Sequence, residues 1–111
     1  MSENKLDLIE DWYYLFDDAD ATFIAPDGSP LKIKNVESNQ IENVLYQHEE
    51  SDSWDWSGAA LVELKGGNFA YLTGWSETTF SGAQHFIAES LETLFKYGMS
   101  PEEEKTIRAT L

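Results

Sequence analysis

The sequence predicts an α+β fold, with a small antiparallel sheet packed by helices. Two apolar runs flank a Gly-Gly pair, which is typical of a β-hairpin, and apolar residues recur at helical spacing in two longer segments. The hydrophobic content of 41% is enough for a packed core. We expect a single acidic α+β domain spanning 1–111, a length that suits one core.

The sheet is expected to centre on a hairpin whose strands are 59–64 and 69–75. The Gly66-Gly67 pair between them supplies two positive φ angles at little steric cost, as a type I′ turn requires. This turn pairs Leu64 with Phe69. Both faces of the resulting ribbon are mostly apolar, so we expect cover on both sides of it, or on one side together with a partner protein.

Helices are expected on either side of this hairpin. Residues 3–18 and 81–97 both place apolar side chains at helical spacing, and Gly98 is a natural residue to end the second. A short helix at 100–109 follows, because Ser100-Pro101-Glu102-Glu103 combines a capping box with proline at the first helical position.

The remaining segments are less regular. Residues 22–36 are expected to form a second extended pair around the turn residues 26–29. Lysines 32 and 34 alternate with apolar residues on its second strand, which is typical of an edge. We prefer a helix for 38–49, because apolar residues recur there at i, i+3, i+4 and i+7, with a strand as the alternative.

The charge balance is strongly acidic. Twenty-one Asp and Glu against seven Lys and Arg give a formal net charge of −14. Such a charge repels nucleic acid and anionic membranes, so a basic protein surface is the natural partner. The chain has no cysteine, which excludes disulfides and thiolate sites. No signal peptide or membrane-spanning stretch is visible, so a cytoplasmic location is expected.

No motif for catalysis or cofactor binding stands out. The stretch 74–78 starts like a nucleophile elbow but ends in Thr instead of Gly, and the Gly-Gly pair belongs to no phosphate-binding loop. Neither histidine has zinc-ligand spacing. We therefore expect no catalytic residue, no cofactor and no metal. A small enzyme or cation-binding protein that uses His48 or His85 with nearby carboxylates remains an alternative.

Candidate partner-binding residues come from two acidic segments, the N-terminal one and the one that leads into the hairpin. They combine carboxylates with two aromatic side chains that could contact a basic surface. The candidates are Asp7, Glu10, Asp11, Tyr14, Asp17, Asp18, Glu49, Glu50, Asp52, Trp54 and Asp55.

One stretch carries a family resemblance. Ala60-Leu61-Val62-Glu63-Leu64, Gly67, Phe69-Ala70-Tyr71-Leu72, Glu77-Thr78-Thr79 and Gly82 resemble a hairpin core of small uncharacterised proteins from bacteriophages and their hosts. The shared stretch is about a quarter of the chain. That family often has Asp and Cys in its tail, where this chain has Ser76-Glu77. The resemblance implies a phage-encoded or phage-derived accessory protein in the host cytoplasm and carries over no site.

These observations favour a non-enzymatic acidic binding protein, such as a phage-type inhibitor of a basic, nucleic-acid-binding host protein. Its binding should weaken as salt rises. The first alternative is a structural or assembly protein that acts as a homo-oligomer, with a homodimer as its simplest form, because a small domain with four Trp has surplus apolar surface. The small enzyme or cation-binding protein described above is the second.

Overall fold

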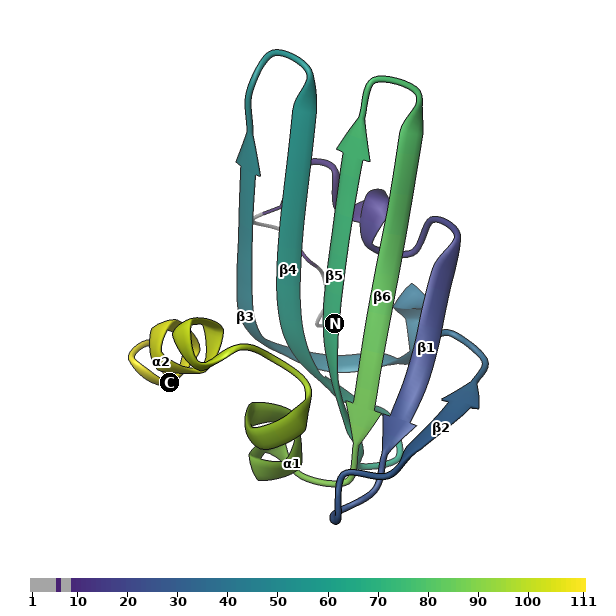
Figure 1. The fold of residues 1–111 in the computed structure, drawn as a ribbon, viewed down its shortest axis with the longest axis vertical. Coiled ribbons are helices and arrows are strands. Elements are labelled where there is room, and N and C mark those ends of the chain that lie inside the picture. The colour runs from purple at the N-terminus through teal and green to yellow at the C-terminus, as the bar shows by residue number, and fades with distance from the viewer. Residues whose placement is uncertain (1–5, 7–8) are drawn as a thin grey trace.

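The computed structural model describes residue 6 and residues 9–111. Within them, six strands form one mixed sheet in the order β2-β1-β6-β5-β4-β3, in which only β1 and β6 pair in parallel (Figure 1). The strands are β1 (Ala19–Ile24), β2 (Pro30–Ile33), β3 (Ile41–Ser51), β4 (Asp55–Leu64), β5 (Phe69–Glu77) and β6 (Phe80–Ala88). The helices are α1 (Leu91–Tyr97) and α2 (Pro101–Arg108), with 3₁₀ turns η1 (Trp12–Leu15) and η2 (Ser38–Gln40). The α+β class is confirmed, but the sheet is larger than predicted and not purely antiparallel.

The central hairpin is confirmed, but its predicted register is wrong by one residue. The amide of Leu64 donates a hydrogen bond to the carbonyl of Asn68 at 2.8 Å, which leaves a three-residue loop. Gly66 and Gly67 both have positive φ, as expected. Because the loop is one residue longer than a type I′ turn, Glu63 and not Leu64 pairs with Phe69. A one-residue slip exchanges the side chains that share a face.

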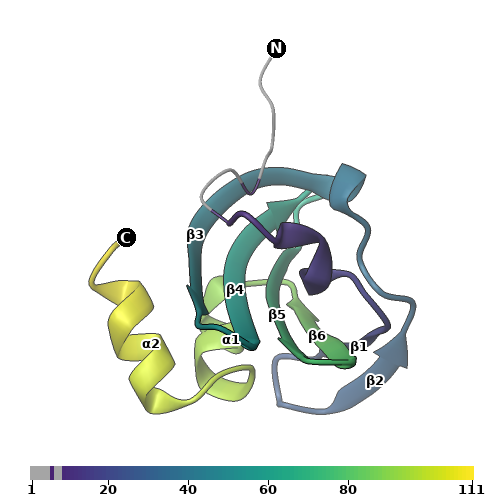
Figure 2. The ribbon, with the colours of Figure 1, turned by 90° about the horizontal axis from the view of Figure 1, so that it is seen from above.

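Both faces of the sheet are apolar, and different elements cover them. The first, called the η1 face, carries Val62, Leu72 and Ile87 against η1 and the segment 34–40 that crosses to β3 (Figure 2). Gly74 permits this contact, because a Cβ there would lie 2.7 Å from the carbonyl oxygen of Tyr14. The small residue thus sets how closely η1 approaches the sheet.

The opposite face, called the helix face, is covered over only part of its length. Leu61 and Tyr71 pack there against Leu94, Phe95 and Ile107 of the two α-helices. The helices lie near the β4–β5 turn, and neither extends to the opposite end of the sheet (Figure 1). The upper part of the helix face therefore remains uncovered by helices.

The predicted helix at 3–18 is wrong where the structure describes it. Residues 1–5 and 7–8 lie outside the described residues, and beyond them only the single turn η1 is helical before β1 begins. Asp18 has a positive φ of 53°, which stops any helix there. The acids at 17 and 18 would also oppose a helix dipole at this end.

The predicted helix at 81–97 is two elements. Its first half is β6, which hydrogen-bonds to β5 on one side and to β1 on the other. The helix starts only after Ser90, whose hydroxyl accepts a hydrogen bond from the Thr93 amide at 3.3 Å. Pairing on both strand edges outweighs the helical spacing of these apolar residues.

The preferred helix at 38–49 is also wrong, since most of it forms β3. The ladder between β3 and β4 shifts register between Ile41 and Asn43, and again between Val44 and Tyr46. Two such irregularities break the strict alternation of a strand and imitate helical spacing. The extended pair predicted for 22–36 is confirmed as β1–β2, although β1 starts earlier, at Ala19, and the capped helix within 100–109 is also confirmed.

Candidate interaction surface

One end of the sheet collects three separate chain segments. The β3–β4 tip at 52–54, the β5–β6 tip at 78–79 and the start of β1 all lie there (Figure 1). The two tips touch, because the Thr78 amide donates a hydrogen bond to the carbonyl of Trp54 at 3.4 Å. We call this region the acidic end, because its surface is made mainly of carboxylates.

Charge is segregated along the molecule. All Lys and Arg side chains in the described part of the chain lie in or beside β2, the β4–β5 turn, α1 and α2, away from the tips. Three of them pair with local acids: Lys32 with Asp20 at 3.7 Å, Lys34 with Glu37 at 3.9 Å, and Arg108 with Glu92 at 2.8 Å. The acidic end has no such base within residues 9–111. Its carboxylates are Asp17, Asp18, Glu49, Glu50, Asp52, Asp55 and Glu77.

Two of these acids have a lowered pKa because they accept hydrogen bonds. Asp52 accepts the amides of Trp54 and Asp55, both at 3.1 Å, and these bonds lower the pKa of its carboxyl. Glu49 accepts the indole N–H of Trp56 at 2.7 Å and the Glu10 amide at 2.8 Å, which lowers the pKa of Glu49. Hydrogen bonds to a carboxylate favour its charged form, so both groups stay ionised at neutral pH.

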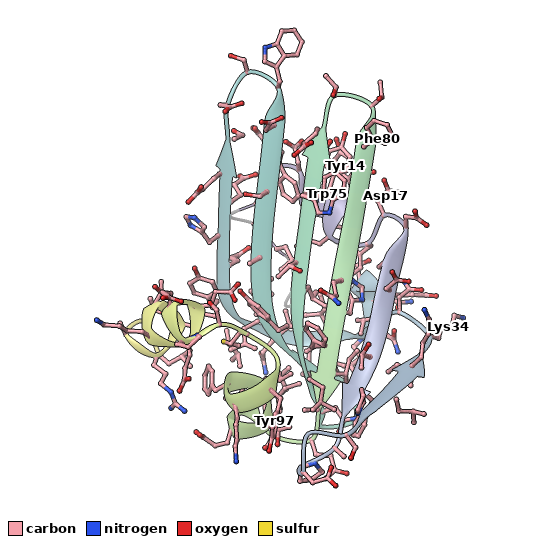
Figure 3. All side chains as sticks on the ribbon, in the orientation of Figure 1. Tyr14, Asp17, Lys34, Trp75, Phe80 and Tyr97 are labelled. Atoms are coloured by element: carbon pink, nitrogen blue, oxygen red, sulfur yellow. The ribbon has the colours of Figure 1, made fainter. Side chains whose placement is uncertain are left out.

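Aromatic side chains are exposed among the carboxylates. Trp54 is 74% exposed, Phe80 69% and Trp75 44%. Figure 3 shows Trp75, Phe80 and Asp17 toward the same end of the sheet, with Lys34 and Tyr97 away from it. Exposed aromatic groups beside charged ones are typical of protein-binding surfaces.

A hollow of about 270 Å³ lies between the two tips. Glu50, Ser57, Trp75 and Gly82 form one cross-strand row over β3, β4, β5 and β6 on the helix face. A Cβ on Gly82 would lie 3.0 Å from Nε1 of Trp75, so the indole leans over this glycine. The hollow is lined by Glu50, Ser51, Asp52, Asp55, Trp56, Ser57, Trp75 and Glu77.

The structure brings most predicted partner-binding residues together, but not all. Glu50, Asp52, Trp54, Asp55, Asp17 and Asp18 share the acidic end, and Glu49 lies there as an internal hydrogen-bond acceptor. Glu10 and Asp11 sit beside Glu49 near η1. Tyr14 is half-buried with its ring 5.5 Å from that of Trp56. Asp7 lies outside the described residues.

Two surface aromatic residues were missed. Trp75 lies in the predicted strand 69–75 and Phe80 directly precedes the predicted helix at 81–97, so neither is among the predicted partner-binding residues. If 80–88 is read as a strand, Phe80 lies opposite Glu77 and Gly82 lies opposite Trp75. These four residues then share one face of the sheet. The signal was present in the alternation of 80–88, where the helical spacing obscured it.

The two histidines have different environments. His85 is fully buried and lies between backbone groups, with Nε2 2.7 Å from the carbonyl oxygen of Leu15 and Nδ1 3.1 Å from the Val36 amide. Within the described residues both ring nitrogens are occupied by backbone groups, which lends no support to the alternative of a cation site at His85. His48 is exposed, lies 3.2 Å from Glu50, and lines a hollow of about 310 Å³ with Glu102 and Glu103.

The acidic end offers concentrated negative charge and aromatic surface for a cationic group. Among the described residues, no three His, Asp or Glu side chains are grouped to hold a metal ion, and no helix there has the length and apolarity needed to cross a bilayer. Comparison of the chain with protein-family models, curated proteins and solved structures gave no match.

Proposed function

We propose that this is a non-enzymatic binding protein that engages a basic protein surface through its acidic end. The segregation of charge carries the proposal: carboxylates from three segments meet where the described chain places no Lys or Arg. A nucleic-acid-binding protein presents the complementary surface, because it carries clustered Lys and Arg for phosphates. The protein would occupy that surface and compete with nucleic acid.

The carboxylates and the exposed aromatic side chains would contribute to binding in different ways. Carboxylates that attract a basic partner from a distance raise the association rate, and their effect falls as salt screens them. Trp54, Phe80 and Trp75 supply apolar area that becomes buried on contact. Aromatic side chains near the centre of an interface commonly carry much of its binding energy.

The proposal is tested by two variants of equal net charge. The tip variant is Asp18→Asn, Asp55→Asn and Glu77→Gln, three exposed acids whose carboxylates accept no hydrogen bond in the structure. Asn also tolerates the positive φ at position 18. The matched control neutralises three acids away from the tips: Glu42→Gln, Glu89→Gln and Glu102→Gln.

The probe is a basic DNA-binding domain, with affinity measured at low and moderate salt and with duplex DNA as competitor. We expect the tip variant to bind at least about 10-fold more weakly than the control, with a smaller salt dependence. Equal weakening by both variants would mean that net charge alone acts. No binding by the wild-type protein at low salt would reject the function.

A cation-binding or catalytic role for His48 is the second candidate. It rests on the exposed His48 ring and its contact with Glu50 at 3.2 Å, since the described residues group no three metal-ligating side chains there. The test is to follow the His48 ring by NMR while divalent metal ions are added. A saturable shift that His48→Gln abolishes would favour this role, and an unchanged ring would remove it.

A further inference from the structure

We propose that the hollow beside Trp75 receives a single arginine side chain of the partner. The inference rests on the proposed function and narrows it from a basic surface to one anchoring group. It depends on the indole, on the volume of the hollow and on the carboxylates that line it, which come from three strands.

Two neighbouring side chains shape the hollow: a small one, Ser57, on β4 and an aromatic one, Trp75, on β5. Ser57 is the cross-strand neighbour of Trp75 on β4, and its short side chain leaves the space open. On the other side of β5, Gly82 has no Cβ, so the indole can lean over β6. The backbone of β6 thus supports Trp75, which remains 44% exposed.

Carboxylates from three strands line the hollow together with this indole. Glu50 comes from β3, Asp55 from β4 and Glu77 from β5, and Asp55 and Glu77 are themselves a cross-strand pair. Like charges directly opposite each other destabilise a strand pair by a few tenths of a kcal/mol or more. A cation between them would relieve this repulsion.

The lining favours arginine over other cations. About 270 Å³ is below the usual range for cofactor and drug sites but is large enough for one long side chain. A guanidinium is planar, stacks on an indole and presents five N–H donors in several directions, whereas an ammonium is a compact and strongly hydrated charge. Carboxylate acceptors from three strands beside an indole therefore match a guanidinium better than an ammonium.

The test compares two peptides of equal length and charge, one with arginine and one with lysine. Binding is followed through the indole N–H resonance of Trp75, assigned with Trp75→Phe, and the other indoles serve as internal references. We expect the arginine peptide to bind at least about 5-fold more tightly and to shift the Trp75 signal most. Equal affinities for the two peptides would overturn the inference.

Variants separate the hollow from general aromatic contact. Trp75→Ala lacks the reporting indole, so its affinities are measured by isothermal titration calorimetry. It should weaken binding of the arginine peptide by about 10-fold and remove the preference over lysine. Trp54→Ala, at the tip and outside the hollow, is the control and should keep the preference. Ser57→Leu fills the floor while keeping every charge and the indole, so it should act like Trp75→Ala.

The outcomes distinguish the inference from the function beneath it. Tight, salt-sensitive binding of both peptides that Ser57→Leu leaves unchanged would reject the arginine site and leave the proposed function standing. No binding of either peptide at low salt would reject both. If Trp75→Ala or Ser57→Leu has altered backbone amide spectra, Trp75→Phe takes its place in the comparison. Trp75→Phe keeps an aromatic ring and should lose only part of the affinity for the arginine peptide.

Discussion

The imidazole of His85 donates a hydrogen bond from Nε2 to the carbonyl oxygen of Leu15 across 2.7 Å, 70 positions away in the chain. Its Nδ1 accepts the amide hydrogen of Val36 at 3.1 Å, which assigns the Nε2–H tautomer because an amide can only donate. One side chain of β6 thus binds η1 and the segment leading to β3 to the same face of the sheet.

Removing this ring should strongly destabilise the fold. His85→Leu fills the position with an apolar side chain but leaves the buried Leu15 carbonyl and Val36 amide without their partner. We expect a loss of about 2–4 kcal/mol in the free energy of unfolding, measured by urea denaturation. His48→Gln, at an exposed position, is the control and should change it by less than about 0.5 kcal/mol. Similar losses in both variants would contradict the role assigned to His85.

The same ring should make stability depend on pH. Burial lowers the pKa of His85 below its ordinary value of 6.5, against the opposing effect of its bond to Leu15. The unfolded chain therefore binds a proton first as pH falls, and folding stability is lost from about pH 6.5 downward until the folded pKa is reached. Unfolding free energies at about pH 7.5 and 5.5 measure this loss. It should be smaller in His85→Leu, and an equal loss there would assign it to other groups.

Tyr71 should hold α2 on the sheet. Its hydroxyl donates to Oε2 of Glu103 at 2.7 Å, while Oε1 of the same carboxylate accepts the Ser100 amide in the capping box. Tyr71→Phe should lower stability by about 1–2 kcal/mol and increase hydrogen exchange in α2 more than in the strands. Tyr46→Phe is the control, because Tyr46 lines the same hollow of about 310 Å³ as Tyr71. Equal exchange in the two variants would show that apolar packing alone holds the helix.

Glu103 adds a second pH window, at more acidic values. Bonds from Ser100 and Tyr71 lower the pKa of the Glu103 carboxyl from 4.5 despite the opposing effect of burial. Stability from this group is present above the unfolded pKa and is lost as pH falls through the lower folded pKa. The loss below about pH 4.5 should be smaller in Tyr71→Phe than in the wild-type protein. An unchanged acid transition would show that Tyr71 contributes little to the ionised form.

Local chemistry predicted the turns and caps, but not the pairing of the strands. The Gly-Gly turn, the turn at 26–29 and the capping box at Ser100 depend on neighbouring residues, and all three are found. The prediction of a helix over 81–88 failed because these residues form β6, which is stabilised by partner strands on both edges. One of these partners is β1, which is more than 60 positions away in the chain. Helical spacing in such a segment reports only burial on both faces.

The candidate site was predicted only in part, because the sequence pattern does not reveal which distant segments the strand order brings together. Carboxylates at 50, 52 and 55 were recognised because they crowd together in the sequence. Their association with Asp17, Glu77 and Phe80 requires three strand ends to meet, which only the strand order establishes. The hydrogen bond from Ser81 to Asp17 at 2.6 Å, across 64 positions, joins the start of β1 to the same end.

Gly74 tests whether η1 determines the packing of the η1 face. A Cβ at this position would lie 2.7 Å from the Tyr14 carbonyl oxygen and 3.2 Å from Cα of Leu15, and backbone atoms cannot move aside as a side chain can. Gly74→Ala should therefore displace η1, weaken the His85–Leu15 hydrogen bond and cost about 2–3 kcal/mol of unfolding free energy. Ser76→Ala, two residues further along β5, is the control, because a side chain with a Cβ is already present there. Urea denaturation and limited proteolysis near Trp12–Leu15 measure the two effects. A stable Gly74→Ala variant with unchanged proteolysis would mean that the sheet, and not the small residue, sets the distance to η1.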